Sequence, residues 1–152
     1  MIFITACSGA KKISNPNTLM LGSITKKEFK KSPYKKWFND EYVSYKIDKQ
    51  NLDKIKDEIS NKDFLIYFGS WCSDSRREVP RFIKIMDYLD INYKNVHFTA
   101  LDRSKSAPNY DKNKWNILYV PTFIILSNGR EIGRIIETPE ESLELDLVKI
   151  LQ

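Results

Sequence analysis

Residues 64–80 read FLIYFGSWCSDSRREVP, and this stretch decides the fold. Its first five residues form a continuous apolar run bounded by Gly69, which predicts a strand buried on both faces of a sheet. From residue 73 to residue 89, apolar side chains recur at helical spacing, which predicts a helix directly after the strand. Cys72 therefore lies between a buried strand and the first turn of a helix.

The position of Cys72 favours a reactive thiol. At a helix N-terminus, unpaired backbone N–H groups and the helix dipole stabilise the thiolate, which is the nucleophilic form of cysteine. Arg76 and Arg77 add positive charge that favours the thiolate, whereas Asp74 in the first helical turn opposes it. Cys72 is therefore the candidate nucleophile of this chain. Glu78, farther along the helix, is expected to be a surface residue rather than a catalytic base.

Outward from this stretch, the pattern predicts further strands and helices. Strands are expected over three later ranges: 96–101, 119–127 and 131–137. Asn128-Gly129 is typical of a tight hairpin turn between the last two strands. A helix is expected over 143–151, and the order of elements predicts an α/β sandwich whose mixed sheet has four to five strands and is covered on both faces.

The region before residue 61 is expected to be an N-terminal extension over 21–60 that packs on the main domain. Residues 50–60 have the apolar spacing of an amphipathic helix, whereas 42–47 either end an aromatic helix or begin a strand. Residues 26–38 of the extension interleave aromatic residues with six lysines, namely Lys26, Lys27, Lys30, Lys31, Lys35 and Lys36. Such a run can bind a nucleic acid, with lysines on the phosphates and aromatic rings stacked on the bases. We interpret it instead as a segment that packs on the domain and exposes its lysines to solvent.

Composition limits the class of protein. A chain of 152 residues with 41% hydrophobic and 30% charged residues fits one soluble globular domain. The net charge of +5 comes from basic and acidic residues that are interleaved, and two cysteines are too few for a disulfide-held scaffold. The one histidine, His97, falls in a strand expected to be buried, so no metal site and no Cys/His protease is expected.

The residues around Cys72 resemble the thioredoxin family. Residues 64–80 are similar to its strand, its Trp-Cys-x-x-Cys site and its kinked helix, and Pro80 stands at the position of the family's helix-bending proline. Val120-Pro121-Thr122 resembles the family's cis-proline segment, which faces the cysteine and offers backbone groups to an extended substrate chain. Over 61–152 the resemblance implies a thioredoxin-like domain in which Trp71, Val120 and Pro121 contact the substrate.

Two departures from the family pattern affect the same chemical step. Ser75 stands where the family has the second cysteine that resolves a mixed disulfide, and Ile66 stands where it has a buried aspartate that helps to deprotonate that cysteine. An engineered Cys-to-Ser change at position 75 would not also remove the aspartate, which favours a natural single-thiol site. Ser75 itself has two open roles, as a hydrogen-bond donor to the thiolate or as an ordinary helix-start residue.

The leading functional hypothesis is thiol–disulfide exchange through Cys72, with Ser75 beside it and an external thiol as the resolving group. This is reductase, deglutathionylase or isomerase chemistry, and a long-lived mixed disulfide favours isomerisation over net oxidation. The expected partners are protein or small-molecule disulfides, without nucleic acid or a cofactor. The alternative is a non-catalytic binding module that uses the groove beside Cys72 and Pro121. A peroxidase on this fold is disfavoured, because Gly69 and Leu65 occupy the positions where it needs a Thr or Ser and a Pro.

The first residues resemble a bacterial lipoprotein leader. Ile4-Thr5-Ala6-Cys7 is similar to a lipobox, which implies a partial signal peptide over 1–7 and lipidation of Cys7. The apolar run before Cys7 has only six residues and no positively charged start, which departs from that pattern. Residues 8–20, rich in Ser, Asn, Lys and Pro, are expected to form a flexible tether. The lipobox implies a location in the cell envelope, on the periplasmic side, with a membrane reductant as partner; without it the expected location is the cytoplasm.

Overall fold

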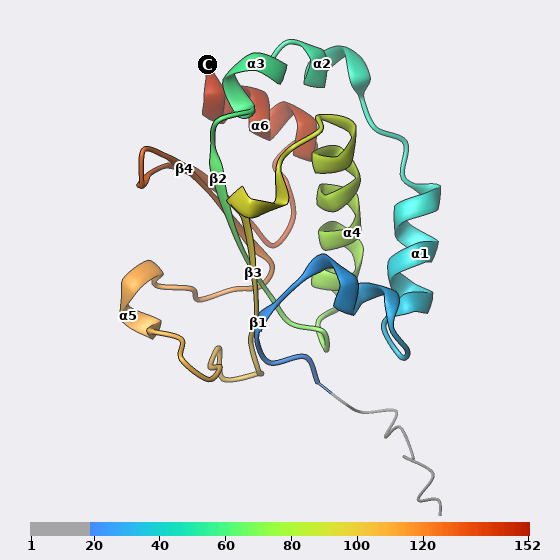
Figure 1. Ribbon diagram of the computed structural model, residues 1–152, viewed down its shortest axis with the longest axis vertical. Coiled ribbons are helices and arrows are strands. Elements are labelled where there is room, and N and C mark those ends of the chain that lie inside the picture. The colour runs from blue at the N-terminus through green and yellow to red at the C-terminus, as the bar shows by residue number, and fades with distance from the viewer. Residues whose placement is uncertain (1–18) are drawn as a thin grey trace, which may run out of the picture.

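The sheet of the computed structural model, which describes residues 19–152, has the strand order β1-β3-β2-β4-β5 (Figure 1). In its centre β2 (Asp63–Phe68) pairs parallel with β3 (Val96–Ala100) and antiparallel with β4 (Thr122–Ser127). At the edges lie β5 (Arg130–Ile136), antiparallel to β4, and β1 (Gly22–Ile24), antiparallel to β3. The predicted mixed α/β fold is confirmed, with five strands.

The helices lie mainly on one face of the sheet. The α-helices are α1 (Lys35–Ser44), α2 (Lys49–Asp53), α3 (Lys56–Ile59), α4 (Ser73–Tyr88), α5 (Lys112–Trp115) and α6 (Leu143–Leu151), and two 3₁₀ turns cover Lys26–Lys30 and Tyr93–Asn95. In Figure 1, α1 and α4 run side by side on one side of the sheet, whereas α5 lies on the other. Alternate strand residues such as Phe64, Ile66 and Phe68 point to the helix face and form the larger core.

Two predicted elements of the extension differ from the structure. The helix expected over 50–60 is divided into α2 and α3, because Ile55 leaves the helical backbone and buries its side chain in the core. The strand interpretation of 42–47 is wrong, since α1 continues to Ser44. After α1, the hydroxyl of Tyr45 donates to the buried carboxylate of Glu144 at 2.9 Å, which ties this segment to α6.

In residues 26–38 the aromatic side chains pack inward, and the lysines other than Lys26 are exposed to solvent. Phe29 is fully buried and stacks on Phe38, with 5.3 Å between the ring centroids. Lys26 forms an ion pair with Asp87 of α4, whose carboxylate also accepts hydrogen bonds from the hydroxyls of Tyr42 and Tyr93, each at 2.7 Å. This carboxylate therefore joins three separate segments of the chain.

The described chain begins inside the segment predicted as a tether. Met20 is buried, and its backbone N–H donates to the hydroxyl of Ser70 at 3.0 Å. Ser70 is the residue directly before Trp71. Residue 22 then enters β1, a strand that the sequence pattern did not predict. The predicted leader with Cys7, and the tether up to residue 18, lie outside the described residues. Within 19–152, no helix has the length and apolarity to span a membrane.

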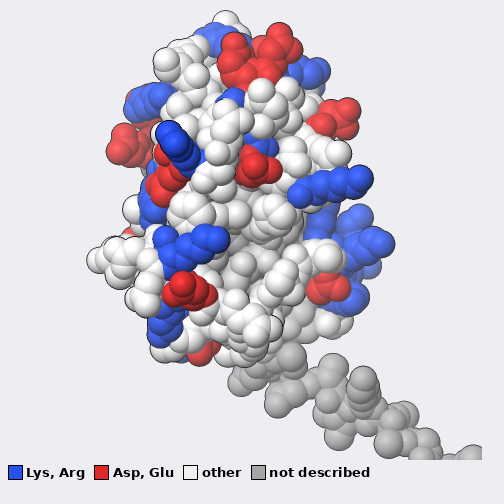
Figure 2. Space-filling view, turned by 60° about the vertical axis from the view of Figure 1, so that its left-hand side comes forward, with Lys and Arg blue, Asp and Glu red and all other residues white. Residues whose placement is uncertain are grey.

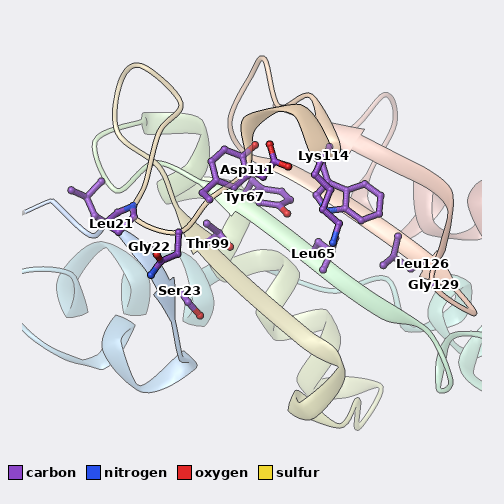
Figure 3. A pocket seen from close by; sticks show the side chains of 14 residues that line it. Leu21, Gly22, Ser23, Leu65, Tyr67, Thr99, Asp111, Lys114, Leu126 and Gly129 are labelled. Carbon is purple, nitrogen blue, oxygen red and sulfur yellow. The ribbon is translucent and has the colours of Figure 1, made fainter.

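The second face of the sheet is covered by a loop rather than by long helices. A smaller core there includes Tyr67, Ile124 and Ile117, and a cavity of about 920 Å³ opens between the strands and the segment that carries α5 (Figure 3). His97 lies exposed on β3, so the prediction of a buried histidine is wrong. Basic and acidic side chains are interspersed on the face in Figure 2, around a mostly uncharged centre.

Candidate functional site

Cys72 occupies the junction that the sequence predicted. The chain leaves β2 at Phe68 and turns so that the N–H of Cys72 donates to the carbonyl of Gly69 at 2.9 Å. Cys72 is the N-cap of α4 with extended backbone angles, and its carbonyl accepts the first helical hydrogen bond, from the N–H of Arg76 at 3.0 Å. The thiol is half-buried, and Cys72 is the one cysteine within the part of the chain that the structure describes.

The thiol faces the loop before β4. Its Sγ donates to the backbone carbonyl of Val120 at 3.3 Å, and the Val120–Pro121 peptide bond is cis. The predicted strand over 119–127 begins only at Thr122, because Pro121 has no N–H to give to the sheet. The Thr122 hydroxyl donates to the carbonyl of Tyr119 at 2.8 Å, which braces the loop. The structure thus brings Cys72 and Val120 together, with backbone polar groups beside the sulfur.

Trp71 closes one side of this site. Its indole Nε1–H donates to the carbonyl of Leu101 at 2.9 Å, which holds the ring over the end of β3. A Cβ on Gly69 would lie 2.6 Å from Cε2 of the indole, so only glycine leaves room for the ring. The guanidinium of Arg103 lies 4.8 Å from the centroid of the indole, and the ammonium of Lys105 lies 5.4 Å from it.

Ser75 makes a contact that neither of its two predicted roles includes. Its side chain is fully buried, and its Oγ accepts a hydrogen bond from the N–H of Gly69 at 3.1 Å. The hydroxyl therefore fixes the turn between β2 and α4 from inside the protein. Because this turn sets the position of the thiol, Ser75 supports Cys72 through the backbone.

The charged residues of the first helical turns pair with one another. Asp74 accepts from Nη2 of Arg77 at 2.8 Å, and Glu78 accepts from Nε of the same guanidinium at 2.7 Å; together these carboxylates raise the pKa of Arg77. Arg76 donates its Nε–H to the carbonyl of Ser70 at 2.6 Å. Glu78 is 3% exposed, so the prediction that it lies on the surface is wrong: the pairing with Arg77 compensates its burial.

Several residues of the site were missed by the sequence analysis. Leu118 and Tyr119, 61% and 54% exposed, precede Val120 and present apolar surface next to the loop. Their position directly before the Val-Pro pair was the available signal. Arg103 and Lys105 gave no such signal, because only the folded conformation of the loop after β3 brings them against Trp71. Among residues 19–152, no three His, Cys, Asp or Glu side chains are grouped so as to hold a metal ion.

Comparison with known proteins identifies the family. The family model described as Thioredoxin matches residues 43–149, which include β2 to β5 and the whole of α4. The chain therefore belongs to the thioredoxin family. It is 31% identical over 101 residues to thioredoxin H2 of Arabidopsis thaliana, covering 66% of this chain and 70% of that protein. It is 24% identical over 105 residues to thioredoxin H5 of Oryza sativa subsp. japonica, covering 67% and 73%.

A solved structure similar to this chain is the oxidized form of mitochondrial thioredoxin 3 from Saccharomyces cerevisiae. It shares 21% sequence identity with a TM-score of 0.41, over 66% of this chain and 87% of that one. Thioredoxin O2 of Arabidopsis thaliana in its oxidized state shares 18% identity with a TM-score of 0.45, over 68% and 86%.

Proposed function

We propose that this protein carries out thiol–disulfide exchange, of the reductase or isomerase type, with Cys72 as its single nucleophile. The Cys72 thiolate attacks one sulfur of a substrate disulfide, a new S–S bond forms, and the other substrate sulfur leaves with the electron pair of the broken bond. A thiol from solution or from the substrate then attacks the mixed disulfide. This second attack releases Cys72 in its reduced form.

The observation that carries this proposal is the arrangement of Cys72, Val120 and Ser75. The sulfur is half-buried at a helix N-terminus and 3.3 Å from the carbonyl of Val120, so a substrate chain laid along the loop finds backbone partners beside the thiol. Ser75 occupies the place of a resolving cysteine, but its oxygen is engaged with Gly69 inside the protein. A serine hydroxyl forms no disulfide, so resolution falls to an external thiol.

The test uses the full chain with Cys7→Ser, so that Cys72 is the remaining thiol. The folded protein is incubated at neutral pH with a peptide disulfide, and the mixed disulfide is followed by mass spectrometry before and after the addition of a small thiol. We expect the mixed disulfide to accumulate and to disappear only after that addition. In Ser75→Cys the mixed disulfide should decay at least about tenfold faster, because the second thiol is held next to it.

The matched control is Ser73→Cys, which adds an equivalent thiol on the exposed side of the same turn. A neighbouring helix residue does not face the same way, so this variant should resolve no faster than the parent. If the folded protein does not react, while the unfolded chain does, thiol exchange is refuted. That result would favour a thioredoxin-fold module that binds partners without using its thiol.

We also propose that the natural protein is a lipoprotein, anchored through Cys7 on the periplasmic side of the cell envelope and served there by a membrane reductant. The support is the sequence Ile4-Thr5-Ala6-Cys7 and the polar composition of the segment after it. Metabolic labelling with a radioactive fatty acid in a bacterial host should label the product of the full gene but not its Cys7→Ser variant. Recovery of an unlabelled product in the cytosol would contradict the anchor.

A further inference from the structure

The side of the reactive site formed by Trp71 carries two positive charges, those of Arg103 and Lys105, and we call these three residues the roof of the site. Arg103 and Lys105 come from the loop that follows β3, and both lie against the indole of Trp71, at 4.8 and 5.4 Å from its centroid. Trp71 is the residue directly before the nucleophile. Both cations therefore lie against the indole that closes one side of the site.

The loop is built to hold this position. Oδ1 of Asp102 accepts hydrogen bonds from the N–H of Ser106 at 2.9 Å and from the hydroxyl and N–H of Ser104 at 2.7 and 2.8 Å, and these bonds hold the pKa of Asp102 below its usual value. The ammonium of Lys105 donates back to the carbonyl of Arg103 at 3.2 Å. The carboxylate is thus engaged with its own loop, and the two cations are turned toward the indole.

The charge of this roof is available to a ligand. Within residues 19–152 neither Arg103 nor Lys105 takes part in an ion pair, whereas Arg77 on the other side of the thiol is paired with Asp74. Stacking on an indole uses the face of a guanidinium and leaves its N–H edge free for a carboxylate. Glu137 lies beside the other loop of the site, the one before β4, where its backbone N–H donates to the carbonyl of Pro121 at 2.7 Å.

We propose that Arg103 and Lys105 make Cys72 selective for polypeptide disulfides flanked by acidic residues. This inference rests on the proposed thiol exchange and specifies its substrate class. The exposed side chains of Leu118 and Tyr119 favour a polypeptide over a small disulfide, because they extend the contact surface along the chain beyond the sulfur. Acidic side chains next to the substrate cysteine then meet the two cations, and apolar side chains farther along meet Leu118 and Tyr119.

The experiment measures the first attack with three activated peptides. Each has one cysteine joined to thiopyridine by a disulfide, flanked by Glu, Gln or Lys in an otherwise identical sequence. Cys72 attacks the peptide sulfur, its bond to the peptide forms, and thiopyridone leaves with the electron pair and a proton and is followed by its absorbance. The protein is the full chain with Cys7→Ser, and a small carboxylate disulfide without a peptide serves as a fourth probe.

At low salt we expect the Glu peptide to react about tenfold faster than the Lys peptide, and this ratio to fall to about threefold or less in concentrated salt. In the double variant Arg103→Gln, Lys105→Gln the ratio should fall to within about twofold. The ratio of rates cancels any general change in thiol reactivity. Lys114→Gln is the matched control, because Lys114 lies over the ring of Trp115, 5.8 Å from its centroid, and lines the cavity of Figure 3, which neither Trp71 nor Cys72 lines. Its ratio should equal that of the parent.

The outcomes separate this inference from the proposal beneath it. If Cys72 reacts with all peptides at equal rates, or if the preference for Glu survives in the double variant, charge selection by the roof is overturned and thiol exchange stands. If the small carboxylate disulfide reacts with Cys72 as fast as the Glu peptide does, selection for a polypeptide is overturned. If the folded protein reacts with none of the probes, both proposals fail.

Discussion

Replacing Ser75 by alanine tests how the turn before Cys72 is held. The hydroxyl is fully buried and accepts the N–H of Gly69 at 3.1 Å, and that N–H is buried as well. Ser75→Ala removes the acceptor and leaves the N–H without a partner, which costs about 1–3 kcal/mol of unfolding free energy. For a domain of this size, the melting temperature should fall by roughly 2–12 °C.

Urea unfolding, followed by circular dichroism, measures the change. The midpoint should fall while the dependence on urea concentration stays the same, because the variant exposes no additional surface on unfolding. Ser73→Ala is the control: Ser73 is exposed on the same helical turn, and its loss should change stability by less than about 0.5 kcal/mol. Equal stability of the two variants would refute the supporting role that we assign to Ser75.

Two further predictions concern the packing around Trp71 and the hydrogen bonds of Asp87. Gly69→Ala should lower the unfolding free energy by about 1–3 kcal/mol, because the new Cβ would lie 2.6 Å from the indole of Trp71; in a Trp71→Ala background the same change should cost little, and a cost equal in both backgrounds would contradict the clash. Burial and the hydrogen bond to Asp87 raise the pKa of Tyr42 to about 12, above the value near 10 of the unfolded chain. The neutral hydroxyl therefore stabilises the fold fully below about pH 10, and this contribution is lost as the pH rises through 12, so Tyr42→Phe should give a flatter pH profile of unfolding free energy; parallel profiles would count against it.

The central part of the fold could be predicted because its elements have strong local patterns. The apolar run at residues 64–68 became β2, and the helix predicted over 143–151 has those bounds in the structure. The helical spacing after Cys72 predicted α4 to within one residue. Elements of weak pattern were missed or divided: β1 has three residues and exists through its pairing with β3.

For the candidate site, the sequence placed Cys72 and the loop opposite it, but not the burial of their neighbours. Glu78 was expected on the surface and His97 in the core, and both are reversed in the structure. Burial depends on which elements lie above a residue, and Glu78 is tolerated inside because the guanidinium of Arg77 reaches it. Neither relation is visible from residue type and spacing.

The sequence by itself determined the class of fold and the position of Cys72 at a helix N-terminus, since each follows from a local pattern. Tertiary structure decided what these residues contact. The hydrogen bond that Ser75 accepts from the N–H of Gly69 depends on how α4 meets β2, and the cations of Arg103 and Lys105 reach Trp71 across about thirty residues of intervening chain. Contacts between segments so distant in sequence form only when the sheet brings the ends of neighbouring strands together, so the charge of the site is a property of the fold.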